Sequence, residues 1–238
     1  MNPINAKAQF GRERWRLRIL KHHFPLFGIS VLGIAALYAT RPYKDVLSRA
    51  SFATAYPALI LLAATLIVGP WNLLRKRRSP ISSDLRRDIG IWAGILGVLH
   101  TAVGQNVHMR GRPWLYYVYE LKEHHTIPLR HDLFGLANHT GAVSVLLLMA
   151  LLATSNDFSL RRLGTSGWKK LQRWNYAVFA LAAAHEVAYQ AIEKQQFLYV
   201  VTVILSIAIT LALQISGFLR RRSEDRSVPR QQLLDSDD

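Results

Sequence analysis

Long apolar blocks constrain the fold of this chain of 238 residues more than any other feature. A helix needs about 20 consecutive apolar residues to cross the hydrocarbon core of a bilayer. Six blocks approach or reach that length, at residues 24–40, 54–74, 88–107, 133–154, 172–192 and 197–219. The first block is short and the fifth carries polar residues. We therefore predict an all-α, polytopic membrane protein with a six-transmembrane-helix bundle over residues 24–219.

The two ends of the chain differ in composition from this bundle. Residues 1–23 are basic, and we predict that they form a cytoplasmic N-terminal segment. Residues 220–238 are polar and mixed in charge. Such a composition buries little apolar surface, so we predict a disordered cytoplasmic tail there.

Positive charge is distributed unevenly between alternate connections. The chain has 30 Lys and Arg against 15 Asp and Glu, a formal net charge of +15. Twenty-two of the basic residues lie in segments 1–23, 75–87, 155–173 and 220–238, and eight lie in the other connections. Because basic connections stay on the cytoplasmic side, we expect both termini in the cytoplasm. Topology and contact with anionic lipid account for the basic excess, so no nucleic-acid partner is expected.

Two of the nine histidines, His100 and His185, lie well inside predicted spans. His100 is 12 residues past Asp88 and His185 is 13 past Gln172, and both spans run outward from the cytoplasm. At 1.5 Å per residue, each lies roughly 18–20 Å from the inner end of its helix, in the outer half of the membrane. Two imidazoles at one depth can take both axial positions of a b-type heme. The chain has no cysteine, which excludes thiolate-bound metals and clusters.

Small residues flank both histidines, as the approach of a porphyrin requires. They are Gly94, Gly97, Thr101 and Gly104 near His100, and Ala182, Ala184 and Ala188 near His185. The same residues also permit close helix packing without any cofactor, and a single intramembrane histidine often serves only packing. The matched depth of the pair favours heme, and a heme-free scaffold stays open as the alternative.

Two stretches of the sequence carry a family resemblance. They are "LRRDIGIWAGILGVLH" (85–100) and "LLATSNDFSLRRLGTSGWKKLQRWNYAVFALAAAH" (151–185). Together they resemble the ferric-reductase-like transmembrane family, and most closely its bacterial branch of heme-binding membrane subunits of the periplasmic methionine-sulfoxide reductase system. The resemblance implies a six-helix bundle that carries b-type heme and moves electrons across the membrane. It also implies that His100 and His185 are the outer heme ligands.

The sequence departs from this branch at one position. The branch usually has "LHR" where this chain reads "LQR", with Gln172 in place of an inner histidine, and Arg87 lies 13 residues before His100. We therefore expect one heme, in the outer half, although His22 or His23 can be considered as a substitute inner ligand. Gln172, Arg173 and Trp174 can hold the head group of a flavin (FMN) or a quinone near the inner half. An ordinary interfacial belt is the alternative for these residues.

Other polar residues lie near the outer side. His139, a little way into the fourth span, can hydrogen-bond a heme propionate or compete as an axial ligand, and a packing role is as compatible with its position. The loop histidines 124, 125 and 131 can bind a metal or a ferric chelate, or be merely solvated. Glu186 can accept a proton or orient a neighbouring imidazole, or simply reach water or a basic partner.

The sequence thus favours a b-type heme protein that transfers electrons across the membrane to an acceptor at the outer, periplasmic face. The donor is expected to be a quinone or a cytosolic flavin reductase. A periplasmic sulfoxide reductase is the partner that the resemblance implies, and another acceptor, including ferric iron, stays open. The alternative function is that of a heme-free accessory subunit that retains the fold.

Overall fold

The structure is a computed structural model that describes residues 13, 15–40, 45–76, 81–109, 111–121, 125–193 and 196–234. It is all-helical in this described part, apart from one isolated bridge between Val118 and Leu129. The elements are a π-helical turn η1 (Ile19–His23), α2 (Phe24–Thr40), α3 (Val46–Leu74), α4 (Ile81–Gly104), a 3₁₀ turn η2 (Pro113–Tyr116), α5 (Leu133–Ala153), α6 (Asp157–Gln172), α7 (Asn175–Ile192) and α8 (Phe197–Leu234).

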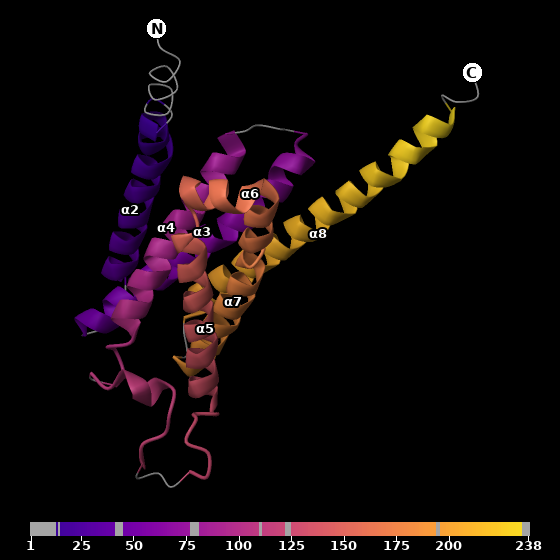
Figure 1. Ribbon diagram of the computed structural model, residues 1–238. Helices are drawn as coiled ribbons and strands as arrows, with labels where there is room; N and C mark the ends of the chain where they lie inside the picture. The colour runs from indigo at the N-terminus through magenta and orange to yellow at the C-terminus, as the bar shows by residue number, and fades with distance from the viewer. Residues whose placement is uncertain are drawn as a thin grey trace.

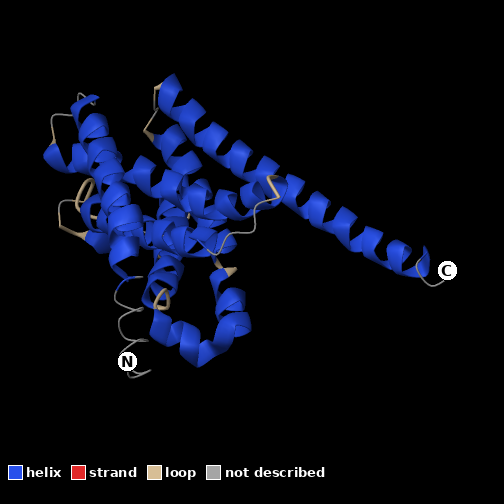
Figure 2. Cartoon of the chain, turned by 90° about the horizontal axis from the view of Figure 1, so that it is seen from above, coloured by secondary structure: helices blue, strands red, loops and turns tan. Residues whose placement is uncertain are grey.

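Helix α3 is the centre of the bundle. It packs against α2, α4, α7 and α8, while α5 packs against α4 and α7. Figure 1 shows α2 on one side of α3 and α8 on the other, and Figure 2 shows the same helices from above. Leu66, Val178 and Val203 are almost fully buried where these helices meet. The start of α2 and the end of α8 lie at one end of the bundle, opposite η2 (Figure 1).

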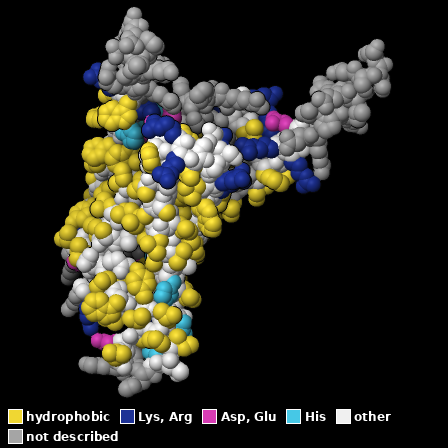
Figure 3. Space-filling model, viewed as in Figure 1, with side chains coloured by type: hydrophobic (Ala, Val, Ile, Leu, Met, Phe, Trp, Pro, Cys, Tyr) yellow, Lys and Arg dark blue, Asp and Glu magenta, His cyan; other side chains and the backbone are white. Residues whose placement is uncertain are grey.

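The chain is a multi-pass membrane protein. Four helical segments of the described chain are long and apolar enough to cross a bilayer, namely Trp15–Thr40, Val46–Leu74, Leu133–Ala153 and Phe197–Glu224. Apolar side chains cover much of the surface along the helices (Figure 3). Helices α4 and α7 do not belong to this apolar set, because ionisable and amide side chains interrupt their sequences. The six-span count therefore stays a prediction, as does the orientation in the membrane.

Helix α6 was not predicted, because its residues read as a basic connection. Its first turn is capped by the side chain of Asn156, which accepts a hydrogen bond from the Ser159 amide at 2.8 Å. Gly164 has a positive φ of 66° and kinks the helix, a conformation that favours glycine. No residue of α6 is buried. The predicted fifth span thus begins at Asn175 on α7, after α6 ends at Gln172.

The C-terminal segment also differs from its prediction. We predicted a disordered tail from residue 220, whereas α8 continues to Leu234 and extends beyond the other helices (Figure 1). Local interactions support this extension. Arg220 pairs with Glu224 one turn later at 3.2 Å, and its Nη1 donates to the Leu74 carbonyl at the end of α3 at 3.1 Å.

Candidate cofactor site

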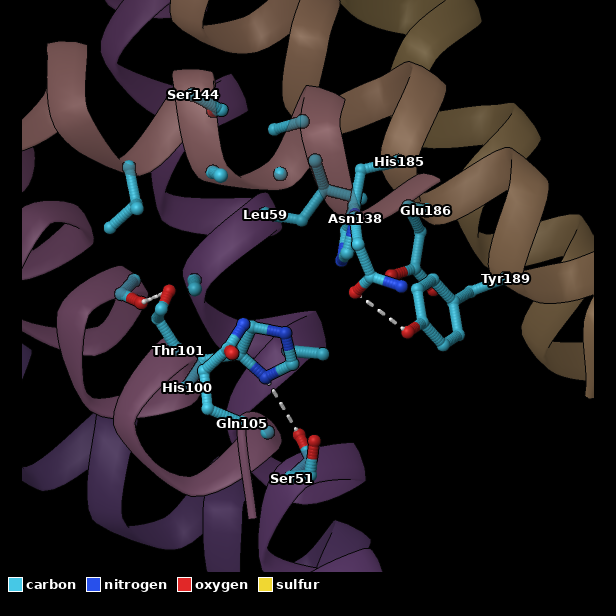
Figure 4. Close-up of a pocket in the computed structure, with 18 of the residues that line it drawn as sticks. Ser51, Leu59, His100, Thr101, Gln105, Asn138, Ser144, His185, Glu186 and Tyr189 are labelled. Carbon is cyan, nitrogen blue, oxygen red and sulfur yellow. Dashed lines mark hydrogen bonds between the residues drawn. The ribbon is translucent and has the colours of Figure 1, made fainter. Parts of the chain in front are cut away.

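A cavity of about 210 Å³ lies between α3, α4, α5 and α7. Apolar side chains form one part of its wall, including Leu59, Leu62 and Leu148. Polar side chains form the rest, and residues of the connection around η2 complete it. Figure 4 shows His100 and His185 reaching this space from opposite sides.

His100 on α4 and His185 on α7 are brought together as the matched depth predicted. Their ring centroids are 6.2 Å apart, and the ring planes cross at 72°. An imidazole nitrogen lies about 2 Å from a metal that it ligates, and its ring centre about 1 Å further away. Two axial imidazoles therefore have ring centres roughly 6 Å apart, so the observed separation fits a bis-histidine iron site.

Each of the two imidazole rings makes a hydrogen bond through its Nδ1 atom to a backbone carbonyl group. The Nδ1–H of His100 donates to the Ser51 carbonyl at 3.0 Å, and the Nδ1–H of His185 donates to the Ala137 carbonyl at 2.7 Å. In a neutral imidazole a proton on Nδ1 leaves Nε2 with its lone pair. Both histidines are thus oriented, in the tautomer required of a metal ligand, by hydrogen bonds of the kind that commonly support metal-binding histidines.

Glycine allows His185 to approach α5 closely. A Cβ atom at Gly141 would lie 2.6 Å from Nδ1 of His185. Gly97, which was predicted to clear space for a porphyrin, lines the cavity, but a Cβ there would lie 2.6 Å from Leu148 Cδ2. Gly94 instead faces Leu152 and serves helix packing. Gly141 was missed because α5 is apolar on all sides and its sequence does not indicate which face meets α7.

A polar wall beside His185 was also largely missed. The Tyr189 hydroxyl donates to Asn138 Oδ1 at 3.0 Å, and the Gln190 amide donates to Glu186 Oε1 at 2.7 Å and to the Tyr56 hydroxyl at 2.9 Å. Glu186 therefore lies in the cavity wall among polar partners. Tyr189 and Gln190 follow His185 and Glu186 by four residues, the spacing that places side chains on one helix face. That spacing was the available signal for them.

The end of the cavity nearest η2 is formed by aromatic and polar groups. His108 Nε2 lies 3.3 Å from Glu193 Oε1, and the His108 ring packs against Tyr189 with centroids 6.4 Å apart. The Tyr116 hydroxyl donates to the Gly104 carbonyl at 2.9 Å, and Gln105 Nε2 donates to the Tyr117 hydroxyl at 2.7 Å. Burial raises the pKa of both tyrosines, so these hydroxyls stay neutral near pH 7.

His139 does not line this cavity. Its Nε2 lies 3.2 Å from the Arg130 carbonyl, and its ring packs near Tyr117. These contacts suit the packing role, and a role of His139 toward a heme stays a prediction. Between η2 and α5, His125 and His131 lie around Tyr119, with the His125 and Tyr119 ring centroids 3.6 Å apart. His124 lies outside the described residues. No group of three side chains suited to a metal ion occurs in the described part of the chain.

The predicted inner cluster lies away from the histidine pair. Gln172 ends α6, and Arg173 and Trp174 are exposed in the short turn before α7; none of the three lines the cavity. The neighbouring Asn175 anchors this turn, because its Nδ2 donates to Thr65 Oγ1 at 2.6 Å. A flavin or quinone role for residues 172–174 stays a prediction.

His22 and His23 both engage a buried carboxylate instead of facing an inner heme. The Asp88 side chain is fully buried and pairs with Arg18, with His22 Nδ1 at 2.7 Å and with His23 Nε2 at 3.3 Å. Trp92 Nε1 donates to His23 Nδ1 at 3.2 Å. The π-helical geometry of η1 places the two consecutive histidines at the same carboxylate, and such turns are frequent at functional sites.

Comparisons with known proteins show which proteins this chain is similar to. No protein-family model matches the chain. A protein of Pectobacterium carotovorum is 30% identical over 195 residues, which is 80% of this chain and 88% of the relative. Proteins of Yersinia pseudotuberculosis and Yersinia pestis are each 34% identical over 145 residues, 60% of this chain and 62% and 61% of theirs. All three carry the name protein-methionine-sulfoxide reductase heme-binding subunit MsrQ.

Proposed function

Because the chain belongs to the MsrQ family of heme-binding subunits of protein-methionine-sulfoxide reductase, we propose that it holds one b-type heme between His100 and His185. We infer that it passes electrons across the membrane to an acceptor at the outer, periplasmic face. The observation that carries this proposal is the pair of imidazoles 6.2 Å apart, each with Nδ1 bonded to a backbone carbonyl.

The residues present fit a heme. His100 and His185 would hold the iron, and the apolar wall of Leu59, Leu62 and Leu148 would contact the porphyrin. When bound, heme supplies one-electron chemistry through its iron. The Ser51 and Ala137 carbonyls keep both imidazoles in one tautomer.

A single heme is part of the proposal. Gln172 occupies the position of the inner ligand, and His22 and His23 are engaged by Asp88 and Trp92. Electrons would reach the outer heme from a quinone or a bound flavin near the inner half, supplied in the second case by a cytosolic flavin reductase. The acceptor would be a periplasmic methionine-sulfoxide reductase, as the names of the relatives suggest, with ferric iron as a second candidate.

The optical difference spectrum tests the proposal against a heme-free accessory subunit. Detergent-purified protein from heme-replete cells is expected to give sharp b-type bands in the reduced-minus-oxidised spectrum. His100→Ala and His185→Ala should each abolish the bands, because each removes an axial ligand. His139→Ala is the matched control and should retain them, since His139 lies outside the cavity. A colourless, folded wild-type protein would establish the heme-free alternative.

A further inference from the structure

The cavity wall carries a polar atom that the histidine pair does not use. Gln190 on α7 is only 8% exposed and lines the cavity. Its Nε2 donates to Glu186 at 2.7 Å and to the Tyr56 hydroxyl at 2.9 Å, so both of its N–H groups have acceptors. Its Oε1 is buried and accepts no hydrogen bond from any residue that the structure describes.

The chemistry around this oxygen defines what it can bind. Nε2 of Gln190 donates to Glu186 and Tyr56, and Oε1 is the atom of this amide that is left without a partner among the described residues. Buried polar atoms in folded proteins almost always have a hydrogen-bond partner, from the protein, from water or from a ligand. Because Gln190 Oε1 is a hydrogen-bond acceptor, the complementary group is a hydrogen-bond donor.

An aromatic cluster includes Tyr56, the residue to which the Gln190 amide donates. Phe52 and Tyr56 line the cavity, and their ring centroids are 4.9 Å apart. Tyr199 on α8 packs against both, with centroids at 4.8 Å from Phe52 and 5.5 Å from Tyr56. Flat aromatic groups pack well on such rings. The local environment therefore combines an unused acceptor with an aromatic wall.

We propose that Tyr56, Glu186 and Gln190 form a hydroxyl-binding subsite beside the histidine pair. It takes the O–H group of a small aromatic hydroxyl compound or of a water molecule, which donates to Gln190 Oε1. The subsite rests on the proposed function for its place next to a heme. Its hydrogen-bonding chemistry depends only on the three side chains.

Calorimetric titration of the purified holoprotein with phenol and anisole tests whether the occupant is an aromatic hydroxyl compound. The two probes have the same ring, but a methyl group replaces the hydroxyl proton of phenol in anisole. We expect phenol to bind about tenfold more tightly, the effect of one buried hydrogen bond. Gln190→Leu should remove this preference. Gln105→Leu is the same change elsewhere on the cavity wall and should keep the preference for phenol. Gln190→Met is a second variant that removes the amide while retaining an unbranched chain, and it should also remove the preference.

Infrared spectra recorded in H₂¹⁶O and H₂¹⁸O test whether the occupant is a water molecule. A bound water gives an isotope-sensitive O–H band that is present in wild type and absent in Gln190→Leu. Either a phenol preference or this band, lost with Gln190, supports the subsite and identifies its occupant. If wild type shows neither, the proposal is overturned. Heme content is measured on the same samples, so a protein without heme would overturn the proposed function and leave the result for the subsite unaffected.

Discussion

At the scale of single residues, Gly141 tests how tightly the site is built around His185. Gly141→Ala places a Cβ where His185 Nδ1 lies 2.6 Å away, so the ring must leave its bond to the Ala137 carbonyl. Loss of such a supporting interaction weakens metal affinity by about 10–100-fold. The heme-to-protein ratio of the purified variant should fall accordingly. Gly28→Ala is the control, because a Cβ there meets nothing within 4 Å; an equal heme content in both variants would contradict the geometry.

The sequence predicted the histidine pair better than its surroundings. His100 and His185 could be identified because counting residues along two helices gives their depth, and depth needs no knowledge of neighbouring helices. Gly141 and Tyr56 could not be identified in this way. They lie on α5 and α3, which are apolar all round, so the sequence does not indicate which faces meet α7. For the same reason the sequence did not indicate that His139 lies outside the cavity wall.

At the scale of elements, the buried Asp88 fastens the start of α2 to α4. Asp88→Asn removes the negative charge and leaves Arg18, with its side chain 14% exposed, without its partner. Breaking a buried pair in this way costs about 3–5 kcal/mol. Asp157→Asn breaks the ion pair with Arg87, and the Asp157 side chain is 64% exposed. We expect this change to lower the free energy of unfolding by less than about 1 kcal/mol. Thermal unfolding in detergent should rank the two variants in this order, and equal melting temperatures would contradict it.

The N-terminus of α3 should be sensitive to acid. Asp45 accepts hydrogen bonds from the Ser48 amide and hydroxyl, each at 2.8 Å, and the amide bond chiefly lowers the pKa of its carboxyl group. A lowered pKa means that the stabilisation is present above the unfolded value near 3.9 and is lost as pH falls through the folded value. The melting temperatures of wild type and Asp45→Ala should therefore differ at pH 7 and converge below about pH 4. A difference in melting temperature that does not change with pH would contradict the stabilising role of the Asp45 carboxylate.

At the scale of the whole molecule, the helical class and the membrane character followed from the apolar blocks. Helix α6 and the extension of α8 did not, because charged residues that suit a loop also form stable helices when caps and ion pairs are available. Two of the six predicted spans, α4 and α7, are the less apolar ones, and they carry the histidine pair. The polar residues that weaken their membrane signal include those that line the cavity.

Electron paramagnetic resonance of the ferric protein tests the central claim most directly. If His100 and His185 hold the iron, their ring planes cross at 72°, and the low-spin signal should be highly anisotropic with one unusually large g-value. We expect one heme per chain. A high-spin signal, which indicates that an axial imidazole is missing, would contradict the bis-histidine site. So would two hemes per chain, or a folded protein that contains no heme at all.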